Sequence, residues 1–402
     1  MAVNRAAFLS EADAGRAVSA SIRYNPGIRP FQFGESSGME IARLVVFAAG
    51  VVLVAGTLYS AIQTFVLPRS ANVLLTRIVF RSLLRVFGLR LRKARTYEQR
   101  DRIMALYAPI GLLLLPPVWL MLVLAGYAGM YWATGVDSLY EAFRTSGSSL
   151  FTLGFVPPLN TASTFLEFSE AAIGLVLVAL LISYLPTIYS AFSRRETLVT
   201  MLEVRAGAPP SAIEMIKRYH RLHGLDSLHD VWVAWETWFS EIEESHTSLA
   251  ALVFFRSPQP DHSWVTASGA VLDTAALMRS SVDAPRDIQA DLCIRAGYLA
   301  LRRIADFFFV RYDPDPKPGD PISITRQEFD AACDELTAQG VPLKPNRDQA
   351  WRDFAGWRVN YDTVLLALAA ITMAPYALWS SDRSVLPTRQ ARLARARRRS
   401  RS

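Results

Sequence analysis

Three long apolar segments constrain the fold of this chain more than any other feature of its sequence. They cover residues 41–67, 107–133 and 171–192. Each is long enough to cross a hydrocarbon core of roughly 30 Å, which takes about 20 apolar residues in a helix. The second segment contains Pro116 and Pro117, which neighbouring helices can accommodate in a membrane bundle. The sequence therefore predicts an all-α membrane protein with three transmembrane helices.

The remainder of the chain is more polar. Of the 402 residues, 51% are hydrophobic and 20% are charged, a balance that indicates a membrane part joined to a soluble part. We expect a mobile arm at 1–40 with no signal-peptide core, a helical cytoplasmic domain at 196–381 and a basic tail at 382–402. The two cysteines, Cys293 and Cys333, suit neither a disulfide framework nor a metal site and fit a reducing compartment.

The basic residues predict the orientation in the membrane. The connection 68–106 holds ten of them, whereas 134–170 holds only Arg144, and Arg194 and Arg195 follow the third span directly. The positive-inside rule then places the first connection and everything after the third span in the cytoplasm. We expect a multi-pass protein of the plasma (inner) membrane, with its N-terminal arm outside.

Arg77, Arg81 and Arg85 recur at every fourth residue among apolar side chains. This pattern predicts an interfacial helix whose basic stripe binds anionic lipid, within a basic segment at 72–95. A voltage sensor is the alternative, since arginines repeated along a helix can sense the membrane field. Further basic residues flank this run and no acidic partner helix accompanies it, which favours the lipid surface.

A fourth apolar run covers residues 363–379. It is marginally short for a span, and a crossing would export the basic tail. We interpret it as a helix that is buried or lies on the membrane surface, with a crossing as the alternative.

The connection 134–170 contains an uncharged turn between two spans. Residues 138–151 predict a short helix that Ser138 caps. The sequence Thr-Leu-Gly-Phe follows at 152–155, and the prolines at 157–158 exclude further helix. Non-helical backbone at membrane depth persists only where protein covers it or where it lines a water-filled path.

This order of span, short helix, Thr152-Leu153-Gly154-Phe155 and span resembles the pore module of the potassium-channel superfamily, including its bacterial two-transmembrane-type members. The resemblance covers about residues 107–195. It implies that the hydroxyl and carbonyl of Thr152 and the carbonyls of Leu153 and Gly154 replace the hydration shell of K⁺ or another monovalent cation. Phe155 would brace this filter with its side chain. One such segment supplies a quarter of a filter, so the resemblance implies a homotetramer around a central axis.

Val156 departs from the family pattern, which has a second glycine at this position. A β-branched residue disfavours the backbone angles that glycine allows, so the preference for K⁺ over Na⁺ stays open. In the third span, Gly174 and Pro186 resemble the gating hinge of an inner helix. Four acidic residues would concentrate cations at the outer mouth: Asp137, Glu141, Glu167 and Glu170.

The cytoplasmic half contains no clear catalytic or metal site. His220 and His223 are one helical turn apart, with His229 nearby, but Gly224 interrupts the geometry and we expect a solvated surface rather than a metal site. No nucleophile elbow surrounds a serine, and no glycine-rich nucleotide-binding turn occurs. The sequence thus predicts no enzyme, no cofactor and no nucleic-acid partner.

Two functions remain. The first is a tetrameric cation channel that its helical cytoplasmic domain gates through the inner-helix hinge. The second is a non-conducting signalling or scaffolding protein that the three spans anchor in the membrane.

Overall fold

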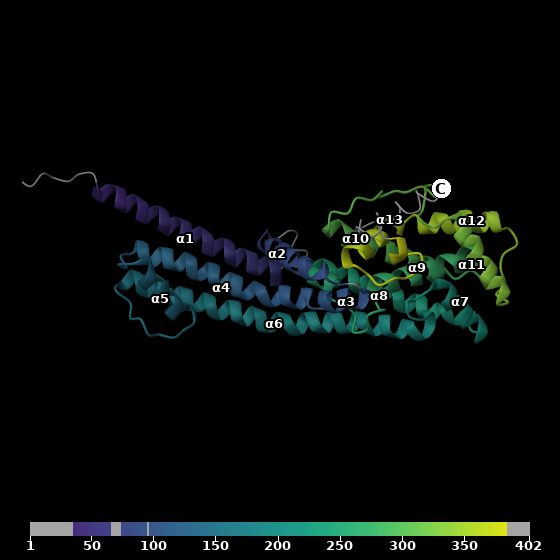
Figure 1. The fold of residues 1–402 in the computed structure, drawn as a ribbon, viewed down its shortest axis with the longest axis horizontal. Helices are drawn as coiled ribbons and strands as arrows, with labels where there is room; N and C mark the ends of the chain where they lie inside the picture. Colours follow the sequence, from purple (N-terminus) through teal and green to yellow (C-terminus); the bar gives the residue numbers. More distant parts are fainter. Residues whose placement is uncertain (1–34, 66–73, 95, 384–402) are drawn as a thin grey trace, which may run out of the picture.

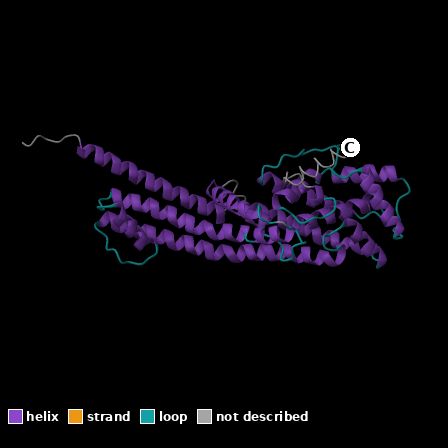
Figure 2. Ribbon diagram, viewed as in Figure 1, coloured by secondary structure: helices purple, strands orange, loops and turns teal. Residues whose placement is uncertain are grey.

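The computed structural model describes residues 35–65, 74–94 and 96–383. The regular elements in these ranges are helices (Figure 2), with one isolated β-bridge between Val282 and Leu343. The prediction of an all-α fold is confirmed. Most of the predicted N-terminal arm and of the basic tail lies outside the described residues.

Within the described residues, three helices are long and apolar enough to cross a membrane, judged by length and composition. They are α1 (Glu35–Phe65), α4 (Tyr107–Ala133) and α6 (Thr161–Ala206). The three lie side by side at one end of an elongated molecule (Figure 1). A helical domain occupies the other end. This arrangement is that of a multi-pass membrane protein with one attached domain.

Two glycines allow α1 and α4 to approach each other closely. A Cβ atom on Gly50 would lie 2.6 Å from the carbonyl oxygen of Gly126, and one on Gly126 would lie 2.7 Å from Val54 Cγ2. Small residues at such crossings are typical of membrane helices, where packing rather than the hydrophobic effect drives association.

Helix α6 is much longer than its predicted apolar part. It has 46 residues and begins at a capping box, in which the Asn160 side chain accepts from Ser163 N while the Ser163 side chain accepts from Asn160 N. It ends at Gly207, whose positive φ of 82° suits a residue without Cβ. A single helix therefore runs from the end of the bundle that is distant from the helical domain into that domain.

Two shorter helices, α2 (Leu74–Leu91) and α3 (Tyr97–Ala105), lie at the junction of the two parts (Figure 1). Phe80 of α2 packs on Gly111 of α4, where an added Cβ would lie 2.5 Å from its ring. Tyr107 Oη donates a hydrogen bond to the Phe80 carbonyl over 3.2 Å. The predicted basic helix is thus held against the base of the second span.

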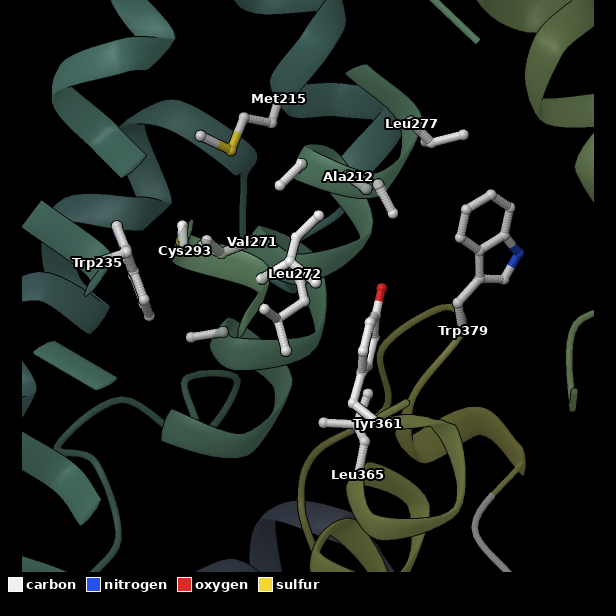
Figure 3. Close-up of a cluster of buried hydrophobic side chains, with 14 of the residues drawn as sticks. Ala212, Met215, Trp235, Val271, Leu272, Leu277, Cys293, Tyr361, Leu365 and Trp379 are labelled. Carbon is white, nitrogen blue, oxygen red and sulfur yellow. The ribbon is translucent and has the colours of Figure 1, made fainter. Parts of the chain in front are cut away.

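The helical domain surrounds α9 (Trp264–Ser280), which is buried on nearly every face. Figure 3 shows Val271 and Leu272 of α9 among Met215, Trp235 and Cys293 from three other helices. The remaining elements of the domain are α7 (Ala212–Arg221), η1 (Leu225–Ser227), α8 (Leu228–Ser248), η2 (Ala250–Phe254), α10 (Ile288–Phe307), α11 (Arg326–Ala338), α12 (Arg347–Arg358), α13 (Asp362–Thr372) and η3 (Ser381–Arg383).

The apolar run 363–379 is a core element of this domain. It is helical only as far as Thr372, in α13, and Met373 ends the helix in a left-handed conformation with φ 49°. Leu365 and Leu368 are fully buried. The 11 residues of α13 extend about 16 Å, roughly half of a hydrocarbon core. The alternative of a fourth crossing does not fit this helix.

A buried ionic cluster ties the end of the domain to α9. The Arg358 guanidinium donates to Asp273 Oδ1 over 2.6 Å, to Asp362 Oδ1 over 2.7 Å and to the Trp379 carbonyl over 2.5 Å. Tyr361 Oη donates to Asp273 Oδ1 over 2.8 Å. The bond to Trp379 ties the segment that follows α13 to this cluster.

Near the end of the described chain, Arg383 donates to Glu328 over 2.8 Å. This hydrogen bond, together with those from Thr325, lowers the pKa of Glu328 from its ordinary value of 4.5 to about 2. The folded state then binds this proton less readily than the unfolded state, so the pair contributes stability above about pH 4.5 that is lost as the pH falls towards 2.

We therefore expect Arg383→Gln to lower the melting temperature of the detergent-solubilised protein at pH 7 more than at pH 3. Intrinsic tryptophan fluorescence measures both values. Arg352→Gln is the control, because that exposed guanidinium bonds to the neutral Gln349. An equal loss at both pH values would mean that the bond to Glu328 is not what Arg383 contributes.

Candidate functional site

The candidate site is built on a short helix, α5 (Leu139–Leu150), between α4 and α6. Its start is fixed by the Ser138 side chain, which accepts a hydrogen bond from Glu141 N over 3.1 Å. The predicted capped helix is confirmed.

Helix α5 enters the bundle at its C-terminal end. Ser146 Oγ lies 3.0 Å from the Leu124 carbonyl of α4, and Ser149 Oγ donates to the Glu167 carbonyl of α6 over 2.7 Å. Gly174 touches the last turn, since an added Cβ would lie 2.4 Å from the Leu150 carbonyl oxygen. Gly174 is about 20 Å along α6 from its first residue at 1.5 Å per residue. The last turn of α5 therefore lies level with the start of the apolar part of α6.

The loop after α5 is attached to a single buried residue, Ser148. The backbone N–H groups of Leu153 and Gly154 donate to the Ser148 carbonyl over 2.8 and 3.4 Å. Those of Phe155 and Val156 donate to Ser148 Oγ over 3.0 and 3.3 Å. Four consecutive N–H groups thus point at one serine.

This arrangement determines where the carbonyl groups of the loop point. In a planar trans peptide the C=O of one residue is antiparallel to the N–H of the next. The N–H groups of 153–156 point towards Ser148, so the carbonyls of 152–155 point away from it. Residues 151–155 are exposed in the single chain, Leu153 at 63% and Phe155 at 54%. The four residues that resemble a filter therefore present four carbonyl oxygens on the side away from α5.

Two residues of the loop have left-handed backbone. Thr152 has φ 54° and Gly154 has φ 67°. Glycine adopts this region without steric cost, whereas threonine does not. Val156 has no positive φ, so the outer end of the loop lacks the conformation that a glycine would permit there.

Glu170 does not lie in the outer mouth, contrary to the sequence-based expectation. It is 0% exposed. Its Oε1 lies 2.5 Å from Ser146 Oγ, and its Oε2 accepts from Tyr131 Oη over 3.0 Å. The Ser146 hydroxyl has one proton and also contacts the Leu124 carbonyl, which can only accept. All of these contacts are satisfied when the Glu170 carboxyl is protonated and donates to Ser146. Glu170 thereby links α4, α5 and α6.

The other acidic residues differ in setting. Asp137 is exposed, and Glu167 is half-buried. Glu141 forms an ion pair of 3.1 Å with Arg144, whose guanidinium carbon lies 5.8 Å from the centre of the Phe155 ring. The Arg144 guanidinium therefore neutralises the carboxylate of Glu141, one of the predicted mouth residues, and contacts the loop.

Gly174 and Pro186, the predicted hinge, lie inside α6, which continues through both. The geometry gives Gly174 a packing role, because only a residue without Cβ leaves room for the Leu150 carbonyl. Pro186 is exposed and lacks the N–H that would bond one turn back. Hinge motion stays a prediction.

The inner end of α6 is joined to the helical domain by Arg195, which is fully buried. Its guanidinium donates to the carbonyls of Leu252 and Phe255 over 2.8 Å each. The backbone carbonyl of Arg195 accepts a hydrogen bond from Trp238 Nε1 over 3.1 Å. His246 Nε2 lies 3.2 Å from Arg195 Nη1. Burial, and secondarily the Arg195 charge, hold the pKa of His246 well below 6.5, so the imidazole is neutral and accepts. The sequence identified Arg195 only as a marker of orientation.

The three candidate metal residues do not form a site. His229 bonds to Asp287 over 3.1 Å, and His223 lies after α7 with φ 53°. Across 35–65, 74–94 and 96–383, no three His, Cys, Asp or Glu side chains come together in a way that could hold a metal ion.

Ser146 and Ser148 were missed by sequence reasoning. The signal for them is the run of small residues at 145–149, four of which carry a hydroxyl, on a helix between two spans.

Comparisons with known proteins identify no relative of this chain. No family model matches the chain, and no curated protein or solved structure matches it either.

Proposed function

We propose that this chain is one subunit of a cation channel in which the carbonyl oxygens of 152–155 coordinate the permeant ion. The observation that carries this proposal is the convergence of four consecutive N–H groups on Ser148, which turns those four carbonyls to the opposite, open side. Carbonyl oxygens in such a row can replace the hydration shell of K⁺ or another monovalent cation.

The position of the loop supports the same function. It follows the C-terminal end of α5, where the helix dipole places partial negative charge that favours a cation. The C-terminal half of α5 is anchored to both flanking spans through Ser146 and Ser149. Rigid attachment of this kind would keep the carbonyl row in place.

Exposed apolar side chains around the loop favour several copies about an axis. Phe151, Leu153, Phe165 and Phe168 are 53% to 70% exposed in the single chain. In a membrane protein such side chains face either lipid or a neighbouring subunit. A homotetramer would cover them and bring four loops together. Each loop alone supplies only one side of an ion path.

Val156 bears on selectivity. Its N–H is held by Ser148 Oγ and its φ is not left-handed, so the outer end of the carbonyl row differs from that of a glycine-containing filter. We expect K⁺ and Na⁺ to be discriminated weakly.

The test is ion flux through the purified protein in liposomes, with Gly154→Ala. A non-glycine residue in the left-handed region costs roughly 1–2 kcal/mol, so we expect flux to fall about tenfold. Gly147→Ala is the matched control, because Gly147 lies inside α5 with open space where the Cβ would go. That change favours the helix and should leave flux intact.

Each outcome decides between the two functions. Flux that Gly154→Ala lowers and Gly147→Ala leaves unchanged supports an ion path along the loop. A folded protein that is monomeric or dimeric and moves neither K⁺ nor Na⁺ supports a membrane-anchored signalling or scaffolding role.

A further inference from the structure

A cavity of about 320 Å³ lies where the apolar helices meet the helical domain. Its walls come from α1, α2, α4 and α6 on the membrane side, and from η2 and the end of α10 on the domain side. The lining is mainly apolar and includes Phe80, Leu112, Leu115, Phe254 and Phe308.

Two arginines of α2, Arg77 and Arg81, also line this cavity. Arg77 is half-buried and Arg81 is exposed. Within the described part of the chain, neither arginine has a carboxylate within ion-pairing distance. Two positive charges therefore stand beside an apolar hollow, and no carboxylate of the described residues pairs with either of them. A molecule with an anionic group and an apolar chain complements both features.

The location identifies the source of such a molecule. Leu112 and Leu115 belong to the first three turns of an apolar span, and α2 is the basic helix expected at the cytoplasmic surface. A lipid of the adjoining leaflet can reach this depth without leaving the membrane. Basic pockets between transmembrane helices on the cytoplasmic side suit phospholipid headgroups.

We propose that this cavity binds one anionic phospholipid, with its phosphate at Arg77 and Arg81 and an acyl chain against Phe80, Leu112 and Phe254. This is a defined site formed jointly by the membrane helices and the helical domain, distinct from general attraction of a basic helix to a charged surface.

A lipid in the cavity would contact the region where the membrane helices meet the helical domain. Ala250, Ala251 and Phe254 of η2 form one wall, and Arg195 of α6 holds the Leu252 carbonyl of the same short helix. The lipid would therefore stabilise one position of η2 relative to α6. An effect on ion flux would rest on the proposed channel function, whereas binding does not.

Native mass spectrometry of the full chain in detergent measures binding of dioctanoyl phosphatidylglycerol against dioctanoyl phosphatidylcholine. We expect a clear preference for the anionic lipid. The double variant Arg77→Gln/Arg81→Gln should weaken that binding by roughly tenfold or more. Arg85→Gln/Arg90→Gln is the matched control, because these residues belong to the same helix but do not line the cavity. It should change binding less than about twofold.

Ala251→Phe is a second variant, since its ring would occupy the cavity while both arginines remain. We expect it to abolish the preference for phosphatidylglycerol, and it decides the matter if the arginine variant does not fold. If both double arginine variants weaken lipid binding equally, the binding reflects general surface charge and the proposal is overturned. Unchanged binding in Ala251→Phe would overturn it too, as would full displacement of the lipid by millimolar inorganic phosphate.

Discussion

Replacing Arg358 with methionine is expected to destabilise the helical domain by about 3–5 kcal/mol, because one partner of a buried ionic cluster is removed. Arg358 is 0% exposed and bridges Asp273 and Asp362. Without the guanidinium both carboxylates stay buried and lack their cation. The Trp379 carbonyl also loses its donor.

The loss should grow with pH. Burial already raises the pKa of Asp273, and Arg358 opposes this rise. In the variant the folded-state pKa rises further above the unfolded value, so ionisation at higher pH disfavours the folded state. Thermal unfolding followed by tryptophan fluorescence should therefore show a larger deficit at pH 8 than at pH 5.

Arg352→Met provides the comparison for this experiment, since it removes an exposed guanidinium from the same helix α12. It should shift the melting temperature little. A deficit in Arg358→Met that is independent of pH would contradict the role given to the buried carboxylates.

The second large effect is expected at Glu170. Glu170→Ala removes the carboxyl that bonds to Ser146 Oγ and Tyr131 Oη and leaves Ser146 only its contact with the Leu124 carbonyl. Each buried polar group that loses its partner costs about 1–3 kcal/mol. Since Ser146 positions the turn next to Ser148, we expect ion flux in liposomes to fall about tenfold or more.

Glu170→Gln is the matched variant. The neutral amide can donate to Ser146 and accept from Tyr131, as the protonated carboxyl does. We expect near-normal melting and flux. If the glutamine variant fails as severely as the alanine variant, the carboxyl acts as an anion, and the proton assigned to it is wrong.

The parts of the fold that the sequence predicts well are those encoded over short distances. Apolar length predicted the three long helices, and Ser138 predicted the start of α5 through one local hydrogen bond. Burial of the run at 363–379 was one of three open interpretations, and the full burial of Leu365 and Leu368 supports it.

The parts that could not be predicted depend on contacts between distant residues. Glu170 stands next to an apolar run and resembles a surface acid, but Tyr131 and Ser146 lie 39 and 24 residues away in the chain. Arg195 resembles a cytoplasmic marker, yet its partners Leu252 and Phe255 come from η2 and the residue after it. In both cases a charged side chain turns inward because groups from other helices satisfy it.

Helix α6 has a mechanical consequence for any communication along this molecule. Its 46 uninterrupted residues form a rod about 70 Å long, which starts after the carbonyl loop and ends inside the helical domain. A tilt of about 5° about its outer end moves its inner end by about 6 Å at that length. Helix α6 can therefore act as a rigid lever. A displacement of the helical domain at Arg195 would change the tilt of α6 by a small angle at its other end, and no helix would have to unfold.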